Sequence, residues 1–179
     1  MSDWPSALLK SPAGVIHSGS DACLCSDGVI INLGVFAVGG VWPVANRALY
    51  IPFIVETTVT AFQMAFEVTT QSGNCDVGLY SEQGARLVSA GSTAVGAAGK
   101  QVINITDTVL TPALYFMAMN VDNTTAAFTR VNALTILQQT VSGMQQQAVG
   151  AVTLPDPATF ANPLTAYIPG LAVALKSTI

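Results

Sequence analysis

Residues 74–131 of this 179-residue chain read NCDVGLYSEQGARLVSAGSTAVGAAGKQVINITDTVLTPALYFMAMNVDNTTAAFTRV, and this stretch decides the fold class. Short extended segments alternate in it with turn residues, namely glycines and the pairs Asp-Thr, Thr-Pro and Asp-Asn. Such a succession predicts antiparallel strands. Residues 114–121 are apolar on both faces, which is the pattern of a central strand that is covered on both sides.

The preceding stretch, residues 57–69, shows the most regular alternation in the chain. Its apolar members are Phe62, Met64, Phe66 and Val68, and its polar members are Gln63, Glu67 and Thr69. Alternation with a period of two predicts a half-buried strand whose apolar face needs a second sheet to cover it. Tight turns are expected at 71–74 and at 81–84, where Gly84 suits a positive φ.

These patterns predict an all-β protein with an antiparallel, jelly-roll-like β-sandwich. Residues 1–46 are expected to form an extended N-terminal arm or a leading hairpin, and residues 47–179 the sandwich domain. The arm contains one strong strand candidate, residues 29–38. The last strand is expected at 165–175.

Residues 138–164 are rich in Gln, then punctuated by Pro, and interrupt the strand pattern before the last strand. Two structures fit this excursion. It can form a short helix around Met144 followed by a loop, or it can be a long segment that reaches out to a partner.

The composition is apolar and poor in charge. Hydrophobic residues make up 51% of the chain and charged residues only 9%, against about 25% in ordinary soluble domains. The mean hydropathy is +0.53. The most apolar run, residues 28–44, contains four glycines and Pro43, so it does not predict a membrane helix. The start of the chain lacks a secretory signal pattern, so we expect a protein that stays in the cytoplasm where it is made. Burial against other copies or other proteins is the expected use of the excess apolar surface.

The net charge is −4, and the six basic residues are scattered singly along the chain. Because nucleic-acid binding needs a basic patch, nucleic acid is not an expected partner.

Three cysteines, Cys23, Cys25 and Cys75, leave two alternatives open. A structural zinc site needs a fourth ligand, which only His17 can supply as a histidine. Otherwise the three are free thiols in a reducing compartment. We expect free thiols and no metal.

No catalytic constellation is apparent. His17 is the only histidine, and no serine lies in a nucleophile elbow. The segment 96–100 resembles a phosphate loop, but Ala94 and Gln101 occupy positions that the motif assigns to Gly and to Ser or Thr. The sequence therefore predicts no enzyme, no catalytic residues and no cofactor.

Acidic residues recur at the predicted strand ends, and they could gather around a calcium ion. They are Asp76, Asp107 and Asp122, the last followed by Asn123. No loop supplies the alternating carboxylates that calcium sites use, so turn formation is the expected role.

Trp and Tyr side chains are expected mainly in the core or in an interface. An alternative is a sugar-binding face on which aromatic rings stack, and Tyr80 and Trp42 are the candidate glycan contacts.

The phrases DVGLYSEQGARLVSAGST and ITDTVLTPALYFMAMNVDNTT resemble a β-sandwich module of virion proteins in tailed bacteriophages, related in shape to jelly-roll carbohydrate-binding modules. The resemblance covers about residues 47–133, and the ending TAYIPGLAVAL is also similar. It implies a structural role in the particle, as a capsid decoration, fibre-base or tail component, and it carries over no site residues. Expected partners are other virion proteins and copies of the chain itself, with glycan binding for adhesion as the alternative.

Overall fold

The structure is a computed structural model. It describes residues 15–16, 23–26, 29–32, 36–131, 136 and 143–177. The strands are β1 (Val15–Ile16), β2 (Cys23–Ser26), β3 (Val29–Asn32), β4 (Phe36–Val41), β5 (Arg47–Val55), β6 (Val59–Thr70), β7 (Asn74–Ser81), β8 (Arg86–Ser89), β9 (Thr93–Ala94), β10 (Gly99–Leu110), β11 (Ala113–Val121), β12 (Ala127–Val131), β13 (Gln145–Ala148) and β14 (Leu171–Ser177).

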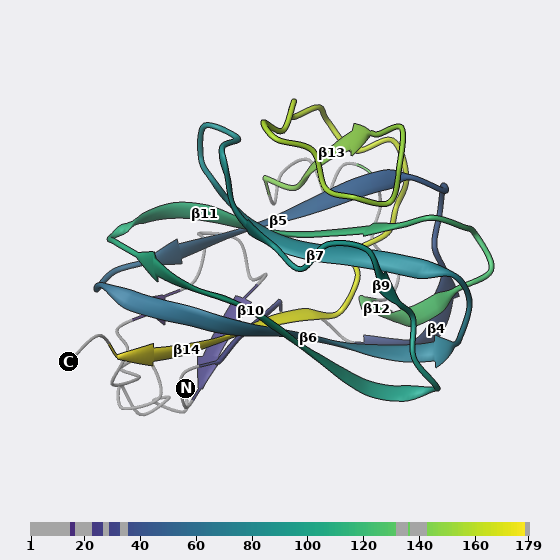
Figure 1. Ribbon diagram of the computed structural model, residues 1–179, viewed down its shortest axis with the longest axis horizontal. Helices are drawn as coiled ribbons and strands as arrows, with labels where there is room; N and C mark the ends of the chain where they lie inside the picture. Colours follow the sequence, from purple (N-terminus) through teal and green to yellow (C-terminus); the bar gives the residue numbers. More distant parts are fainter. Residues whose placement is uncertain are drawn as a thin grey trace, which may run out of the picture.

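The strands form two antiparallel sheets that pack face to face (Figure 1). Sheet A has the order β1-β5-β11-β7-β8, with β13 also paired to β5 and β9 also paired to β7. Sheet B has the order β2-β3-β14-β6-β12-β4, and β10 pairs with β6. The predicted antiparallel β-sandwich is therefore confirmed.

Strand β6 supplies much of the inner face of sheet B. Met64, Phe66 and Val68 are buried as the alternation predicts, and the core continues with Ala61 in place of Phe62. The pairing with β14 explains the difference, because the register shifts between Ala174 and Leu175 and leaves Phe62 without a partner in that ladder. Such a bulge reverses the alternation, so the inward position predicted for Phe62 is wrong.

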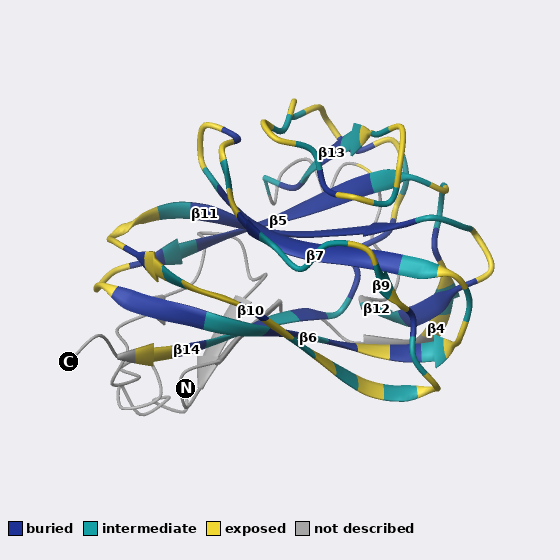
Figure 2. Cartoon of the chain, in the orientation of Figure 1, coloured by how far each residue is buried: buried dark blue, intermediate teal, exposed yellow. Residues whose placement is uncertain are grey.

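Strand β11 lies in the middle of sheet A, between β5 and β7, as the sequence predicts. Met117 and Met119 belong to the core between the sheets, whereas Phe116 and Ala118 belong to a second cluster on the outer face of sheet A. Figure 2 shows the three central strands of this sheet buried along most of their length. Both faces of β11 are apolar, and both are therefore covered by other parts of the protein.

The cover on the outer face is residues 149–161, which we call the covering segment (Figure 1). Leu154 and Phe160 pack there against Tyr50, Tyr80 and Phe116. Residues 143–161 of the excursion therefore fold back onto their own sheet and do not extend away from it. The other alternative, a short helix around Met144, is also wrong, because β13 follows Met144 directly and pairs with β5.

Several strands lie in the zone predicted as an arm or hairpin. Strands β2 and β3 form a hairpin whose second strand pairs with β14, and β1 pairs with β5. The single strand expected at 29–38 corresponds to two strands, β3 and β4, and β4 pairs with β12. The last strand begins at Leu171, six residues later than predicted.

Strand β10 runs through a position that the sequence marked as a turn. The Asp107-Thr108 pair lies inside the strand, at a register irregularity between Asn104 and Thr108, and the turn comes only at Thr111. Three residues of β10 oppose Phe62 alone at this point, so the ladder absorbs the break without ending.

Candidate assembly surface

One side of the sandwich is bordered by strand edges that have no partner among the described strands. Strand β8 is the last strand in the order of sheet A and pairs with β7 alone. Strand β10 pairs with β6 alone. An unpaired edge exposes a row of backbone amide and carbonyl groups, which is a template for pairing with another chain. At 12 residues, β10 is long for such an edge.

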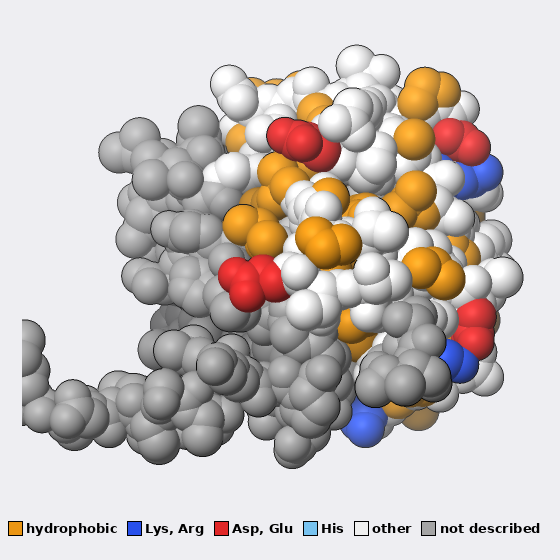
Figure 3. All heavy atoms as spheres, turned by 90° about the vertical axis from the view of Figure 1, so that its left-hand side faces the viewer, with side chains coloured by type: hydrophobic (Ala, Val, Ile, Leu, Met, Phe, Trp, Pro, Cys, Tyr) orange, Lys and Arg blue, Asp and Glu red, His pale blue; other side chains and the backbone are white. Residues whose placement is uncertain are grey.

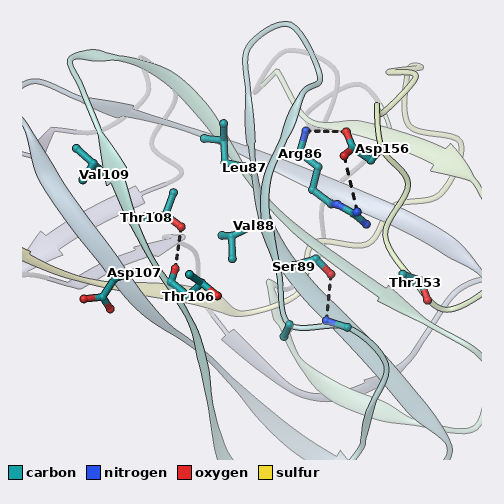
Figure 4. Close-up of a pocket in the computed structure, with 12 residues that line it drawn as sticks. Arg86, Leu87, Val88, Ser89, Thr106, Asp107, Thr108, Val109, Thr153 and Asp156 are labelled. Carbon is teal, nitrogen blue, oxygen red and sulfur yellow. Dashed lines mark hydrogen bonds and ion pairs between the residues drawn. The ribbon is translucent and has the colours of Figure 1, made fainter.

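A groove of about 820 Å³ lies between these two edges (Figure 4). Its walls come from 86–91 on one side and 106–109 on the other, with Thr153 and Asp156 from the covering segment. Arg86 and Asp156 form an ion pair at its rim, with 3.7 Å between Nη2 and Oδ2. The groove thus offers hydroxyl groups, one neutralised charge pair and free strand edges.

Three large hydrophobic side chains are exposed on these two edge strands. The exposed fraction is 39% for Leu87 on β8, 47% for Val102 and 61% for Val109, both on β10. Figure 3 looks onto the end of the sandwich where β10 turns into β11, at right angles to the view of Figure 1, and hydrophobic side chains lie there among polar ones in the described part of the chain. Exposed apolar groups beside unpaired edges mark a surface suited to association.

Charged side chains lie on the outer face of sheet B next to this edge. Asp107 of β10 forms an ion pair with Lys176 of β14, and the Lys176 ammonium also lies 5.5 Å from the centre of the Phe62 ring. Asn104 accepts a hydrogen bond of 2.8 Å from the Gln63 side chain. Lys100 has no carboxylate within ion-pairing distance among the described residues.

Polar side chains of sheet A fasten the covering segment beside the groove. Asp76 and Asn120 are fully buried neighbours on β7 and β11. The Asp76 Oδ2 atom accepts hydrogen bonds from the Ser89 hydroxyl at 2.7 Å and from the Leu154 amide at 2.8 Å. Asn120 Nδ2 donates to the carbonyls of Ala151 and Val152.

Two further side chains extend this fastening. Tyr80 donates to the Pro155 carbonyl at 2.6 Å, and Arg86 donates to the Leu154 carbonyl. The Gly84 turn joins the same contact, because the Ala158 amide donates to the Gly84 carbonyl. Gly84 has φ +86°, as the sequence predicts, and a β-carbon there would lie 2.6 Å from the Ala158 oxygen.

Both candidate glycan contacts are inaccessible. Trp42 and Tyr80 are 0% exposed. Trp42 packs edge-on against Phe128 and Tyr167, and Tyr80 packs edge-on against Tyr50 beneath the covering segment. The predicted glycan-contact role needs an open ring face, which neither side chain has in this structure. Their burial agrees with the core position that the sequence favours for Trp and Tyr side chains, although most of the covering residues lie more than 70 positions away.

The buried tyrosines are held in the neutral form. Burial raises the pKa of Tyr80 well above its usual range, and the nearby Tyr50 acts in the same direction. Burial likewise raises the pKa of Tyr50 and of Tyr167. These hydroxyl groups therefore serve as hydrogen-bond donors in the core.

The three aspartates considered as calcium ligands do not share one site. Asp76 is buried within β7, Asp107 pairs with Lys176, and only Asp122 lies in a turn. No group of three acidic, cysteine or histidine side chains within the described residues is placed to hold a metal ion. The turn-forming role holds for Asp122 and Asn123, whereas for Asp76 and Asp107 it is wrong.

Cys75 is a buried free thiol, and burial, aided by the neighbouring Asp76 and Asp122, raises its pKa to about 12. A thiol that stays protonated is a poor nucleophile and a poor metal ligand. The side chains of Cys23 and Cys25, and the whole of His17, lie outside the described residues.

Asp122 ties the β11–β12 turn to the start of β7. Its carboxylate accepts hydrogen bonds from the Asn74 amide at 3.0 Å, from Asn74 Nδ2 and from Asn123 Nδ2. Partial burial acts to raise the pKa of Asp122, but these hydrogen bonds outweigh it and the pKa is lowered. Gly73 is required beside it, because its φ is +58° and a β-carbon would lie 2.2 Å from Asp122 Oδ1.

We expect Asp122→Ala to lower the free energy of unfolding at pH 7 by about 1 kcal/mol, since the lost hydrogen bonds are partly exposed to water. A lowered pKa means that the native state binds this proton more weakly than the unfolded chain. The stabilisation is therefore complete above the unfolded-state pKa of about 4 and disappears as the pH falls through the lower native-state pKa.

Urea unfolding of Asp122→Ala and of the parent chain between pH 7 and pH 2 measures this difference. Glu56→Ala, an exposed carboxylate in the β5–β6 turn, is the matched control. A gap between Asp122→Ala and the parent that stays constant at low pH would show that the carboxylate charge plays no part.

The fold defines the chain as a β-sandwich protein, and β8 and β10 border one of its sides with edges that are unpaired among the described strands. No protein-family model, curated protein or solved structure matches it. Within the described residues, no helix has the length and hydropathy needed to cross a membrane.

Proposed function

We propose that this chain is a non-enzymatic structural protein of a tailed-bacteriophage particle, as a capsid decoration, fibre-base or tail component. It assembles in the host cytoplasm and associates with copies of itself and with other virion proteins. The observation that carries the proposal is the open side of the sandwich, where Leu87, Val102 and Val109 are exposed beside unpaired strand edges. The resemblance of about residues 47–133 to virion modules supports the same role.

The composition supports an assembled state. With only 9% charged residues, the surface has few of the groups that keep monomeric proteins apart in solution. In an assembly, the apolar edge would be removed from water. Each Å² of apolar surface that is buried would favour association by about 25 cal/mol.

Mass spectrometry of purified particles, from the phage whose genome encodes the chain, tests the structural role. We expect the chain at a fixed copy number per particle. A chain that is absent from particles, and that sediments as a monomer when purified, contradicts the proposal.

The double variant Leu87→Asp/Val109→Asp tests the surface. We expect it to incorporate into particles at least about tenfold less than the parent, because two charges would be buried without partners. Leu164→Asp is the matched control, since Leu164 is 65% exposed in the loop between the covering segment and β14. Equal incorporation of the two variants would exclude the open side as the assembly surface.

A further inference from the structure

Strand β10 has a charge pattern that is complementary to itself. Along its outer side the strand exposes Lys100, Val102 and Asn104, while Ile103 and Ile105 face the core. The irregularity between Asn104 and Thr108 then changes the alternation. As a result Asp107, seven positions after Lys100, also lies on the outer side, where it reaches Lys176.

We propose that β10 pairs with β10 of a second copy, antiparallel and across a two-fold axis at Ile103, so that both sheets B join into one continuous sheet. This inference rests on the proposed structural role and names the partner of the open side. Antiparallel pairing of an edge strand satisfies its free amide and carbonyl groups, and a two-fold axis presents the same strand from both copies.

The register follows from matching the faces of the two strands. Opposite residues in an antiparallel pair point to the same face, so Ile103 lies opposite Ile103 of the second copy, and Val102 opposite Asn104. The next pair along the ladder, one position farther from the two-fold axis, is Gln101 with Ile105. Without an irregularity, Lys100 would then meet Thr106.

The alternation of β10 shifts by one position at the irregularity, because Asp107 lies on the outer side although Ile103 and Ile105 face the core. A one-residue bulge against the second copy at this point brings Asp107 opposite Lys100 on the outer face. The two-fold axis creates this pair twice, so each copy contributes one cation and one anion at opposite ends of the shared ladder. The break that interrupts pairing with β6 is therefore what makes the free edge complementary to itself. The exposed Val102 is covered between the two ion pairs.

Analytical ultracentrifugation of variants with reversed charges tests the pairing. We expect the parent chain to form dimers, and Lys100→Asp to weaken dimerisation at least about tenfold, because two carboxylates then face each other at each end. Asp107→Lys should weaken it similarly. The double variant Lys100→Asp/Asp107→Lys restores opposite charges and should dimerise within about threefold of the parent.

Two controls separate the interface from the stability of the monomer. Lys176→Gln removes the ion pair within one chain but leaves Asp107 for the second copy, so dimerisation should be retained. Val41→Asp places a charge on an exposed side chain of β4, at the opposite edge of sheet B, and should leave the dimer intact, whereas Val102→Asp should not. Thermal melts confirm that each variant is folded.

Folded single variants that dimerise as well as the parent, or a double variant that fails to recover, would overturn the pairing. The outcome is separable from the fate of the structural role. A chain found in particles but monomeric at millimolar concentration retains the role and loses this interface. If the double variant restores dimerisation but the chain is absent from particles, the interface is retained and the structural role is lost.

Discussion

Trp42→Ala is expected to lower the free energy of unfolding by about 3–5 kcal/mol, the largest effect of any single change considered for this chain. Trp42 is 0% exposed and lies where the two sheets meet. Its ring centre is 5.9 Å from that of Phe128 on β12 and 5.4 Å from that of Tyr167, which precedes β14. Truncation would leave a cavity between three segments that cannot all move inward.

Trp42→Phe is the matched variant. The Trp42 Nε1 atom is buried without a hydrogen-bond partner, so replacing the indole by a phenyl ring removes an unsatisfied donor as well as some packing. We expect a cost of about 1–2 kcal/mol for Trp42→Phe, well below that of the alanine variant.

Urea unfolding at one fixed protein concentration, monitored by far-ultraviolet circular dichroism, measures both variants. A stable, folded Trp42→Ala chain would contradict the buried position and would restore a surface role for this residue. The expected loss of stability would also confuse any test in which Trp42 is replaced to abolish glycan binding.

Asp76→Ala is expected to lower the free energy of unfolding by about 2–4 kcal/mol. The substitution deletes two hydrogen bonds to a charged acceptor and leaves the buried Leu154 amide without a partner. One term opposes this loss, because Asp76 Oδ1 is buried without a hydrogen bond and its desolvation is relieved. Two charge-assisted hydrogen bonds, at about 1.5–3 kcal/mol each, outweigh that relief.

The loss should be concentrated in the covering segment. Hydrogen exchange and limited proteolysis are expected to show faster opening of residues 149–161 in Asp76→Ala, while the β5–β11–β7 ladder stays protected. Glu82→Ala, an exposed carboxylate in the β7–β8 turn, is the control and should change stability by less than about 0.5 kcal/mol. Uniform loss of protection over all strands would show that Asp76 supports the sheet and not the segment.

Local pattern was sufficient for most of the strands. Alternation in residues 57–69, the doubly apolar residues 114–121 and the glycine at position 84 each predict a feature that depends on nearby residues only. The prediction failed at Phe62 and at Asp107-Thr108, where a register irregularity lets strands continue past a break. Irregularities depend on the neighbouring strand, so no single strand's sequence marks them.

The candidate surface was predictable only in part. A charge content of 9% and a positive mean hydropathy indicate an associating protein, without locating the surface. Which edges stay unpaired depends on the order of strands in each sheet, and β8 and β10 are far from the ends of the chain. The alternative of a glycan contact stayed open for Trp42 and Tyr80 because the residues that cover them are distant in sequence.

The sequence by itself determined that residues 74–131 form successive strands of a sandwich with a central β11, because side-chain periodicity acts over a few residues. Only the tertiary structure decided that the Gln- and Pro-containing excursion covers sheet A, that Asp76 is a buried acceptor and not a turn former, and that β10 is an open edge. These outcomes depend on contacts between residues 30 to more than 100 positions apart, where burial and hydrogen bonding override local preference.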